Sequence, residues 1–547
     1  MSLQFITGNS GNGKTKYLFN RIVKEAKANP RDNYLVIVPE QFTMQTQRQL
    51  VDLSENKAIM NIDVLSFKRL AYRVFDELGI TNLTVLEETG KNLVLRKLAA
   101  QEADKLGVIG RNLNRIGYIS EVKSLLSELV QYNISPEELG RYIASGRLSD
   151  TLSDKLKDVL VLYEAFEKFM KDRYITAEEI LNVLCNVADE SAILRNSVIA
   201  FDEFTGFTPI QNQLIKKLFV ISKKIYVTLT IDCREDIFKS RGMQELFDMP
   251  KGTVKSLTEM AAFYGIEVEE PIILDKNYRL AENEELSFME QQLFRKRRCS
   301  FEKVPKHIHI DCLRDPKQEL TKIARRINEL VRNENLRYRD IAIVTGDVNI
   351  YAGYVREIFD KYNIPYFIDA TQEILFHPFI EFIRSIPDIA AQNFSADAVF
   401  RFLRCGFSEL LDSEIDVLEN YVLACGVRGK SAWDKKWVRL PKHKAGYDLE
   451  LLNQSREYIM ELLKPVYQVF SDKKSTVKDY VLAIYKLIVL LDIPDKLAKK
   501  EQALLDAGDQ TASKEYGQIY KIVMQLFEKY VAGGGEAGGK KICGGAG

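Results

Sequence analysis

Close to its first residue the chain reads Gly8-Asn9-Ser10-Gly11-Asn12-Gly13-Lys14-Thr15, the strongest local signal for its fold. It fits the pattern G-x-x-x-x-G-K-[ST], in which glycines let backbone N–H groups turn toward an anion. A short apolar strand at residues 3–7 precedes it, and residues 15–28 have the apolar spacing of a helix. This strand–loop–helix setting predicts a phosphate-binding loop for a nucleotide. The alternative is a glycine-rich turn.

Each part of the loop has an expected task in binding ATP. The backbone of residues 8–13 surrounds the phosphates, and Lys14 reaches the β- and γ-phosphates as a catalytic residue. The Thr15 hydroxyl completes the coordination of Mg²⁺. The helix that follows presents its positive N-terminal end to the same anion. The expected cofactors are therefore ATP and Mg²⁺.

A second acidic element is needed to hold Mg²⁺ and to activate the attacking water. The apolar run at residues 197–201 ends in Asp202-Glu203. We expect Asp202 to hold Mg²⁺ at the strand tip and Glu203 to act as the general base or to position the water. The alternative is a surface acidic pair after a strand. The loop upstream favours the metal site, because Mg²⁺ otherwise lacks a protein carboxylate.

Composition bounds the class of protein. The chain has 547 residues, which predicts three or four domains, and its 77 basic and 77 acidic residues cancel. A zero net charge excludes bulk polycation binding but allows a local basic surface for DNA. No apolar run is long enough for a membrane helix, and no leader precedes the first strand, so we expect a cytoplasmic protein. The seven cysteines form no CxxC pair, which argues against a zinc or iron–sulfur site in this chain.

Strand and helix patterns predict an α/β fold with two parallel-sheet cores, each with a mostly helical insertion. Apolar strands at 34–38, 61–65, 198–201 and 225–231 indicate one core that is split by a helical stretch. Further strands are expected at 307–312, 341–344 and 365–368. This is the domain organisation of P-loop NTPases of helicase superfamily 1, with RecA-like cores. The predicted segments are 1–78 (first core, phosphate loop), 79–192 (helical insertion), 193–285 (first core, acidic strand), 286–385 (second core), 386–530 (helical insertion) and 531–547 (glycine-rich disordered tail or truncation).

Several strings occur in the order of one known family, across about residues 1–430. Besides the loop, they are VPEQFT at 38–43, SFKRLAYR at 66–73, FTGFTP at 204–209, RYRDIA at 337–342, IPYFID at 364–369, HP at 377–378 and LENY at 418–421. On these residues the chain resembles the B subunit of the AddAB-type ATP-dependent helicase/deoxyribonuclease of Gram-positive bacteria.

The resemblance implies a role in DNA repair. Members form a heterodimer with an A subunit, which is the motor, and resect double-strand breaks for recombination. The B subunit has a helicase-like body, a C-terminal nuclease domain braced by an iron–sulfur cluster, and a surface that scans single strands for a short regulatory sequence. The nuclease carboxylates and cluster cysteines of the family would lie beyond residue 547, so this chain alone is expected to be neither a nuclease nor an iron–sulfur protein.

The resemblance also implies which residues contact DNA. They come from two loops and from the segment after the acidic strand: Gln41, Thr43, Phe67, Arg69, Tyr72 and Phe207. Aromatic faces stack on bases, Arg69 can pair with a phosphate or a base edge, and the Gln41 amide can read a base. The alternative for Phe67, Tyr72 and Phe207 is a place in the hydrophobic core.

Three functions follow from these observations. The chain is a helicase-like ATPase subunit of a nuclease complex, or a scanning module whose ATP is structural or regulatory, or an unrelated P-loop kinase or ATPase. Size, split core and ordered strings disfavour the third. The arginine that completes such an ATP site is not evident in the sequence, and no adenine-reading glutamine precedes Gly8. We therefore expect the chain to bind ATP–Mg²⁺ and to hydrolyse it slowly. Glu203, in contrast, argues that the chain is competent for hydrolysis in principle.

Overall fold

The computed structural model describes residues 1–534 apart from 81–84, 87, 109–116, 146–147, 172–173, 177, 241, 296–298, 370–373, 442–446 and 473. The chain divides into two compact units. Unit 1 comprises Met1–Cys299, Asp472–Lys486 and Leu497–Gly547, and unit 2 comprises Ser300–Ser471 and Leu487–Lys496. Most of the predicted tail, residues 535–547, lies outside the described residues. Its first residues, 531–534, belong to a helix, which shortens the predicted tail.

Unit 1 contains a seven-stranded parallel sheet. Its order is β3-β2-β6-β7-β1-β8, and β9 also pairs with β1. The strands are β1 (Ser2–Gly8), β2 (Tyr34–Ile37), β3 (Ile62–Leu65), β6 (Val198–Phe201), β7 (Lys224–Thr230), β8 (Glu267–Val268) and β9 (Ile272–Leu274). Strands from both sides of the long helical stretch therefore form one sheet. One strand, β7, separates the strand before the phosphate loop from the strand before Asp202.

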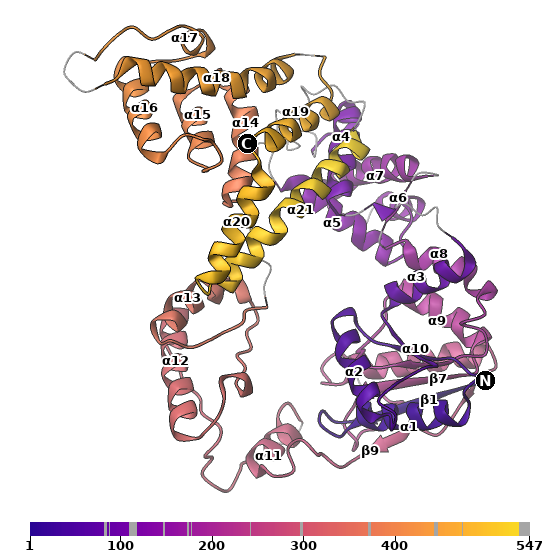
Figure 1. Cartoon of the computed structure of the whole chain (residues 1–547). Helices are drawn as coiled ribbons and strands as arrows, with labels where there is room; N and C mark the ends of the chain where they lie inside the picture. Colours follow the sequence, from indigo (N-terminus) through magenta and orange to yellow (C-terminus); the bar gives the residue numbers. More distant parts are fainter. Residues whose placement is uncertain are drawn as a thin grey trace. The chain divides into compact units, whose positions relative to one another are not determined.

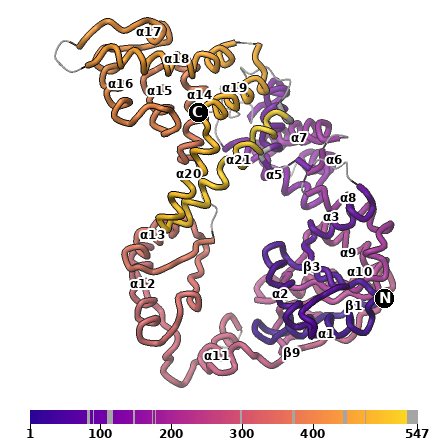
Figure 2. The backbone as a smooth tube through the Cα atoms, viewed as in Figure 1, coloured from indigo at the N-terminus to yellow at the C-terminus, as the bar shows by residue number. Residues whose placement is uncertain are grey.

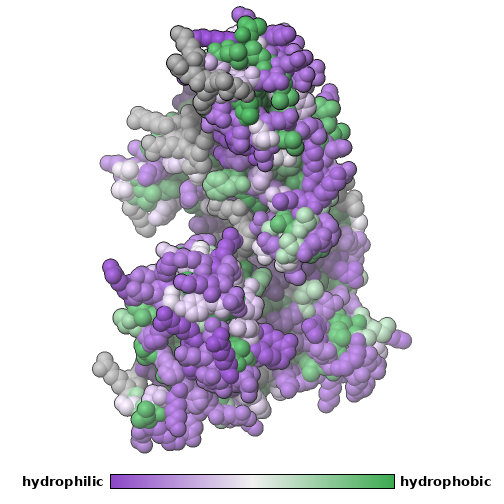
Figure 3. Space-filling model, turned by 60° about the vertical axis from the view of Figure 1, so that its left-hand side comes forward, coloured by the Kyte–Doolittle hydropathy of each residue, from purple (hydrophilic) through white to green (hydrophobic). Residues whose placement is uncertain are grey.

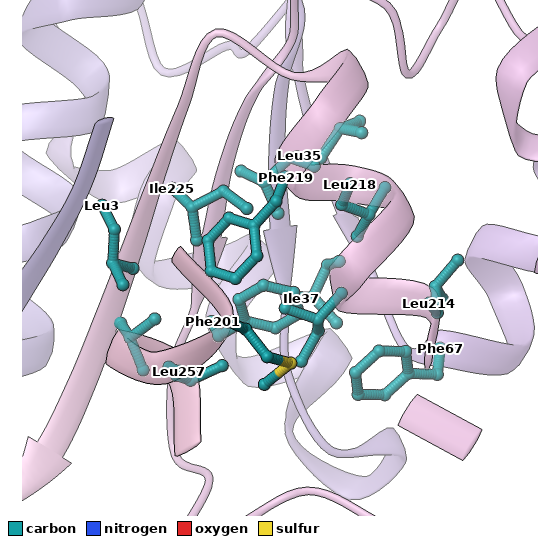
Figure 4. Packing of buried hydrophobic residues seen from close by; sticks show 14 of the residues in the cluster. Leu3, Leu35, Ile37, Phe67, Phe201, Leu214, Leu218, Phe219, Ile225 and Leu257 are labelled. Carbon is teal, nitrogen blue, oxygen red and sulfur yellow. The ribbon is translucent and has the colours of Figure 1, made fainter. Parts of the chain in front are cut away.

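Helices cover both faces of this sheet, as a parallel sheet requires. Alternate residues of β2 divide between two apolar clusters: Leu35 and Ile37 join one, and Tyr34 and Val36 the other. The helices are α1 (Lys14–Ala28), α2 (Thr43–Leu53), α3 (Phe67–Leu78), α8 (Ile180–Val187), α9 (Pro209–Ile221) and α10 (Asp248–Phe263). α1 and α2 contribute to one cluster, and the other four to the cluster drawn in Figure 4. Figures 1 and 2 show these elements grouped near the N-terminus.

A helical subdomain lies between β3 and β6 in the chain, as the periodicity predicts. It comprises α4 (Glu88–Gln101), α5 (Tyr118–Gln131), α6 (Pro136–Ala144) and α7 (Asp150–Met170), with a two-stranded sheet of β4 (Val85–Leu86) and β5 (Ile175–Thr176). Its helices surround an apolar cluster of their own. Lys91 is buried there and is neutralised by Glu88 at 2.9 Å and Glu178 at 2.6 Å. The last helix, α21 (Gln510–Gly534), packs on α4.

The second predicted sheet is not formed among the described residues of unit 2. Residues 307–312, 341–344 and 365–368 are not strands. Ile310 and Val344 are each 93% exposed, and Phe367 is 88% exposed. Among these residues no neighbouring strand offers hydrogen bonds, and isolated strands are not stable in water. The two helices of this region, α12 (Pro316–Asn333) and α13 (Val348–Lys361), pack on each other around a small apolar cluster.

The rest of the chain is helical, which agrees with its periodicity. The helices are α11 (Glu284–Gln292), α14 (Pro378–Ala391), α15 (Ala396–Leu403), α16 (Asp412–Cys425), α17 (Lys430–Trp433), α18 (Leu449–Ser471), α19 (Val477–Leu490) and α20 (Ile493–Asp506). Short 3₁₀ turns are η1 (Glu40–Phe42), η2 (Ala103–Lys105), η4 (Ala188–Glu190) and η5 (Tyr338–Asp340). In the described part of the chain, no helix has the length and apolar character needed to cross a bilayer. Hydrophilic residues predominate on the face in Figure 3.

Candidate nucleotide site and strand-facing surface

The phosphate loop joins β1 to α1, and its backbone needs glycine. Gly11 and Gly13 have φ angles of 90° and 79°, in the left-handed region that favours glycine. A Cβ atom on Gly8 would lie 2.6 Å from the carbonyl oxygen of Leu274, and one on Gly11 would lie 2.8 Å from Asn277 Oδ1. The loop is therefore closely packed against the end of β9 and the segment that follows it.

Lys14 points into the loop. Its Nζ donates hydrogen bonds to the carbonyl oxygens of Gly8 at 3.1 Å and Asn9 at 3.0 Å. Burial lowers the pKa of Lys14, while the nearby Glu203 and Asp202 carboxylates act in the opposite direction. An ammonium group that is partly removed from water and held by two neutral acceptors is prepared to bind phosphate oxygens instead.

The end of β6 brings Asp202 and Glu203 next to Thr15. The Thr15 hydroxyl lies 3.3 Å from Asp202 Oδ1 and 3.3 Å from Glu203 Oε1. Asp202 is 1% exposed, and the Thr228 hydroxyl of β7 donates to its Oδ1. Among the residues that the structure describes, none donates a hydrogen bond to Asp202 Oδ2.

A divalent cation fits this arrangement. Burial raises the pKa of Asp202, because its negative charge is removed from water, while hydrogen bonds from the Thr228 and Thr15 hydroxyls act in the opposite direction. A hard cation with oxygen ligands, such as Mg²⁺, would supply the missing positive charge beside Thr15. Among the described residues, no group of three or more His, Cys, Asp or Glu is placed to hold a metal by protein ligands alone. Mg²⁺ in proteins is usually held by one or two carboxylates together with waters and substrate phosphates.

Glu203 has an unusual backbone conformation. Its φ is 63°, a left-handed value that non-glycine residues rarely adopt, and such conformations concentrate at functional sites. Its side chain is exposed and lines the same cavity as Lys14 and Thr15. A carboxylate in this place can accept a proton from a water molecule that attacks a phosphate.

These groups surround one cavity of about 710 Å³, a size within the range of ligand sites. The phosphate loop, the end of β6 and its following loop, β7, and the start of α1 contribute to the lining. Gln49, Asp52 and Leu53 of α2 also reach it. The structure thus brings Lys14, Thr15, Asp202 and Glu203 together, as the sequence predicts.

One part of the site was missed from the sequence. Tyr278 and Arg279, after β9, line the cavity. The Tyr278 N–H donates to the Gly11 carbonyl at 3.0 Å, and Asn277 Nδ2 donates to the Ser10 carbonyl at 3.0 Å. No arginine for this site was evident from the sequence, and Arg279 is a candidate because of its place in the cavity lining. The pairing of β9 with β1 brings this segment beside the loop, and the Asn-Tyr-Arg string carries no signal strong enough by itself.

Arg279→Ala is expected to weaken ATP binding about tenfold more than ADP binding. Arg279 lies close enough to Lys14 to lower its pKa, and a charged hydrogen bond to the outermost phosphate is worth about 1.5–3 kcal/mol. Competition against a fluorescent nucleotide measures both affinities. Arg31→Ala, at an exposed arginine outside the cavity, is the control. Equal losses for ATP and ADP would place Arg279 away from the terminal phosphate.

The candidate DNA contacts differ in exposure. Gln41 and Arg69 are exposed, and Tyr72 is 38% exposed. They follow β2 and β3, which are neighbouring parallel strands. Both segments therefore lie at the carboxyl ends of the strands, on the same side of the sheet as the phosphate loop. Thr43, in contrast, is 3% exposed, and its hydroxyl donates to the Glu40 carbonyl at 3.0 Å. Its position favours a structural role in the turn over a contact with DNA.

The structure favours the core alternative for Phe67. This residue is 7% exposed and lies in the apolar cluster with Phe201 (Figure 4). Its ring stacks on Phe201 at 5.8 Å and meets Phe204 and Phe207 edge-on at 5.5 Å and 6.3 Å. These contacts leave little of the ring for a base. Phe207 is partly buried against the same cluster, and Tyr72 remains open to solvent.

Comparisons with known proteins show the family of this chain. A family model described as "ADDB, N-terminal" matches residues 5–290. A Lachnoclostridium phytofermentans protein, named as the B subunit of an ATP-dependent helicase/deoxyribonuclease, is 38% identical over 541 residues, which cover 97% of this chain and 47% of that protein. Proteins with the same name from Clostridium novyi and Caldanaerobacter subterraneus are 31% and 32% identical; each match covers 97% of this chain and 46% of the relative.

The chain thus spans about half the length of the curated relatives it matches. These relatives are named as one subunit of an enzyme, which implies that each has a partner subunit. The family model covers both halves of the sheet, from the phosphate loop to the segment that carries Arg279. The protein described here belongs to the AddB family, and it matches the N-terminal part of that family.

Proposed function

We propose that this chain binds ATP with Mg²⁺ in the cavity of unit 1. We further propose that it binds a DNA single strand at the carboxyl ends of β2 and β3. It would act as the helicase-like subunit of a heterodimeric helicase/exonuclease in the cytoplasm, with an A subunit as its partner. The complex would resect double-strand breaks for recombination repair. The observation that carries the proposal is the convergence of Lys14, Thr15 and Asp202 on one cavity. The parallel sheet with β7 between β1 and β6 is consistent with a P-loop helicase core.

The geometry supports a specific division of labour. Lys14 and the loop N–H groups bind the phosphates, Thr15 and Asp202 hold Mg²⁺, and Glu203 accepts a proton from the attacking water. Mg²⁺, when bound, neutralises charge on the phosphate oxygens. Arg279 approaches from the segment after β9 and would stabilise charge on the outermost phosphate.

A second candidate is a scanning module in which ATP is a structural or regulatory ligand and the partner is the motor. The absence of strands at 307–312, 341–344 and 365–368, all within the described residues, favours it, because superfamily 1 motors use two sheet cores. The ATPase rate with and without single-stranded DNA separates the two candidates. Strong DNA-stimulated turnover that Lys14→Ala abolishes would exclude the scanning module, and slow turnover without stimulation would exclude the motor.

Tyr72→Ala is expected to weaken single-strand binding about 5- to 150-fold, because stacking on a base is worth about 1–3 kcal/mol. Arg69→Ala should also weaken it, and neither change should alter ATP affinity. Fluorescence anisotropy with a labelled oligonucleotide measures the affinity. Tyr132→Ala is a matched control, since Tyr132 is 61% exposed in the helical subdomain of the same unit. Unchanged strand affinity in Tyr72→Ala and Arg69→Ala would show that DNA binds elsewhere.

A further inference from the structure

Asn9 of the phosphate loop holds two other parts of unit 1. Its Nδ2 donates a hydrogen bond to Glu290 Oε1 of α11 at 2.7 Å, and its Oδ1 accepts one from the Cys233 N–H at 3.0 Å. Asn9 is 5% exposed, so its amide is largely shielded from water. One side chain therefore connects the loop to α11 and to the segment after β7.

The carbonyl oxygen of Asn9 accepts hydrogen bonds from two groups that a bound phosphate would need. These are Lys14 Nζ at 3.0 Å and the Asn12 N–H at 3.2 Å. We call this arrangement the closed form of the loop. When a loop of this kind binds phosphates, its lysine and its backbone N–H groups donate to phosphate oxygens instead. Phosphate binding would therefore remove both donors from the residue whose side chain holds α11.

Polar contacts matter for the position of α11. None of its nine residues, all of which the structure describes, is buried. Besides the contact at Glu290, the Gln291 carbonyl oxygen accepts a hydrogen bond from Arg234 Nη2 at 3.0 Å. A helix without a buried residue gains little from hydrophobic packing, so the loss of one polar contact loosens it substantially.

The backbone just after α11 is strained. Phe294 has a φ angle of 58°, a left-handed value that bulky residues rarely adopt, and its side chain is 79% exposed. The next residue is fixed, because Arg295 Nε donates to Asp232 Oδ2 at 3.0 Å. Strain between a weakly packed helix and a fixed arginine favours movement of α11 about this point.

We propose that the contact between Asn9 and Glu290 is an autoinhibitory latch, which holds the phosphate loop in its closed form with α11 beside it until the phosphates of ATP open it. The inference rests on the proposed function, because it requires that ATP binds in this loop. Two consequences follow from thermodynamic linkage. ATP binding loosens α11, and a substitution that opens the latch strengthens ATP binding.

The test measures the affinity for ATP–Mg²⁺ of the full 547-residue chain and of two variants by calorimetric titration. Glu290→Ala removes the acceptor of the Asn9 amide. Glu290→Gln removes the same charge but keeps an oxygen that can accept from Asn9 Nδ2. The glutamine variant is therefore the matched control for the attraction that a lost negative charge adds for a polyphosphate.

We expect Glu290→Ala to bind ATP–Mg²⁺ about fivefold more tightly than the unaltered chain, because the fraction of loops in the open form limits the apparent affinity. Glu290→Gln should gain less than about twofold, since most of its loops stay closed. A gain in affinity on removal of a side chain distinguishes a latch from a residue that merely supports the loop, whose loss would weaken binding.

Hydrogen–deuterium exchange reports on α11 directly. In the unaltered chain, saturating ATP–Mg²⁺ should speed the exchange of peptides from residues 284–293 about fivefold, the same factor as the gain in affinity, because coupling is reciprocal. In Glu290→Ala this exchange should be fast with or without nucleotide. Peptides from α10, which contributes buried residues to the core, are the internal reference; unchanged protection there shows that unit 1 is folded.

The outcomes separate the latch from the proposed function. Tighter ATP binding in Glu290→Ala than in Glu290→Gln, with faster exchange of α11 on ATP binding, supports the latch. Equal gains in the two variants would assign the effect to charge and overturn it. Unchanged or weaker binding in Glu290→Ala would overturn it, as would α11 exchange that ATP slows or leaves unchanged. In these cases the proposed ATP site stands. No ATP binding by the unaltered chain would overturn both.

Discussion

Lys14→Ala is expected to reduce the affinity for ATP–Mg²⁺ at least about 100-fold. Two charged hydrogen bonds to phosphate oxygens are worth about 1.5–3 kcal/mol each, and alanine removes both. The fold should persist, because within the described residues the hydrogen bonds of this side chain go to the carbonyl oxygens of Gly8 and Asn9, which can turn to water. Calorimetric titration with ATP in excess Mg²⁺ measures the affinity.

Lys24→Ala is the control for this experiment. Lys24 is an exposed lysine on the same helix, α1, and does not line the cavity. It should bind ATP as the unaltered chain does, which separates loss of a phosphate contact from loss of one positive charge. Equal affinities for Lys14→Ala and Lys24→Ala would remove residues 8–15 from the nucleotide site.

Asp202→Asn is expected to abolish the gain in ATP affinity that Mg²⁺ provides. The amide keeps an oxygen for the Thr228 hydroxyl, but it lacks the charge that holds the cation. We expect the affinity for ATP to fall about 10- to 100-fold in the presence of Mg²⁺, because one interaction with a charged group is worth about 1.5–3 kcal/mol. In the presence of a chelator the affinity should change little. Nucleotide titrations with Mg²⁺ and with EDTA give the two values.

The same variant should not lower the unfolding temperature. The ionised Asp202 carboxylate is removed from water, and within the described residues its second oxygen lacks a donor. This burial raises its pKa, so its charge destabilises the folded chain without metal. Asp76→Asn, at an exposed position of α3, is the control for the change of charge. Unfolding at a markedly lower temperature in Asp202→Asn alone would show that the carboxylate has a structural role instead. Retained Mg²⁺ dependence would place the cation elsewhere.

The residues that line the candidate nucleotide site were largely predictable, because their signals are local. The phosphate loop needs glycines at fixed positions between a strand and a helix, and these requirements are visible in residues 3–28. Asp202 and Glu203 stand at the end of an apolar strand, where parallel strands carry functional groups. The left-handed backbone of Glu203, in contrast, follows from its surroundings and has no trace in the residue type.

The burial of aromatic residues was not predictable in the same way. Phe67 and Tyr72 both belong to the SFKRLAYR string, yet one is 7% and the other 38% exposed. Helix α3 turns Phe67 toward Phe201 and leaves Tyr72 at the surface. A family resemblance identifies both positions, but the faces of the helix decide which of the two is open to a strand.

Residue spacing within short segments was enough to predict the phosphate loop, the acidic pair, the helical stretches and the split of the first sheet. Tertiary structure decided that Arg279 enters the cavity, that Glu40 joins Arg69, and that the segments at 307–312, 341–344 and 365–368 do not form strands. These outcomes depend on which distant segments become neighbours. A strand needs a neighbouring strand with which to form hydrogen bonds, and an ion pair between two loops needs both loops at the same end of a sheet. Neither condition can be inferred from the residues of one segment alone.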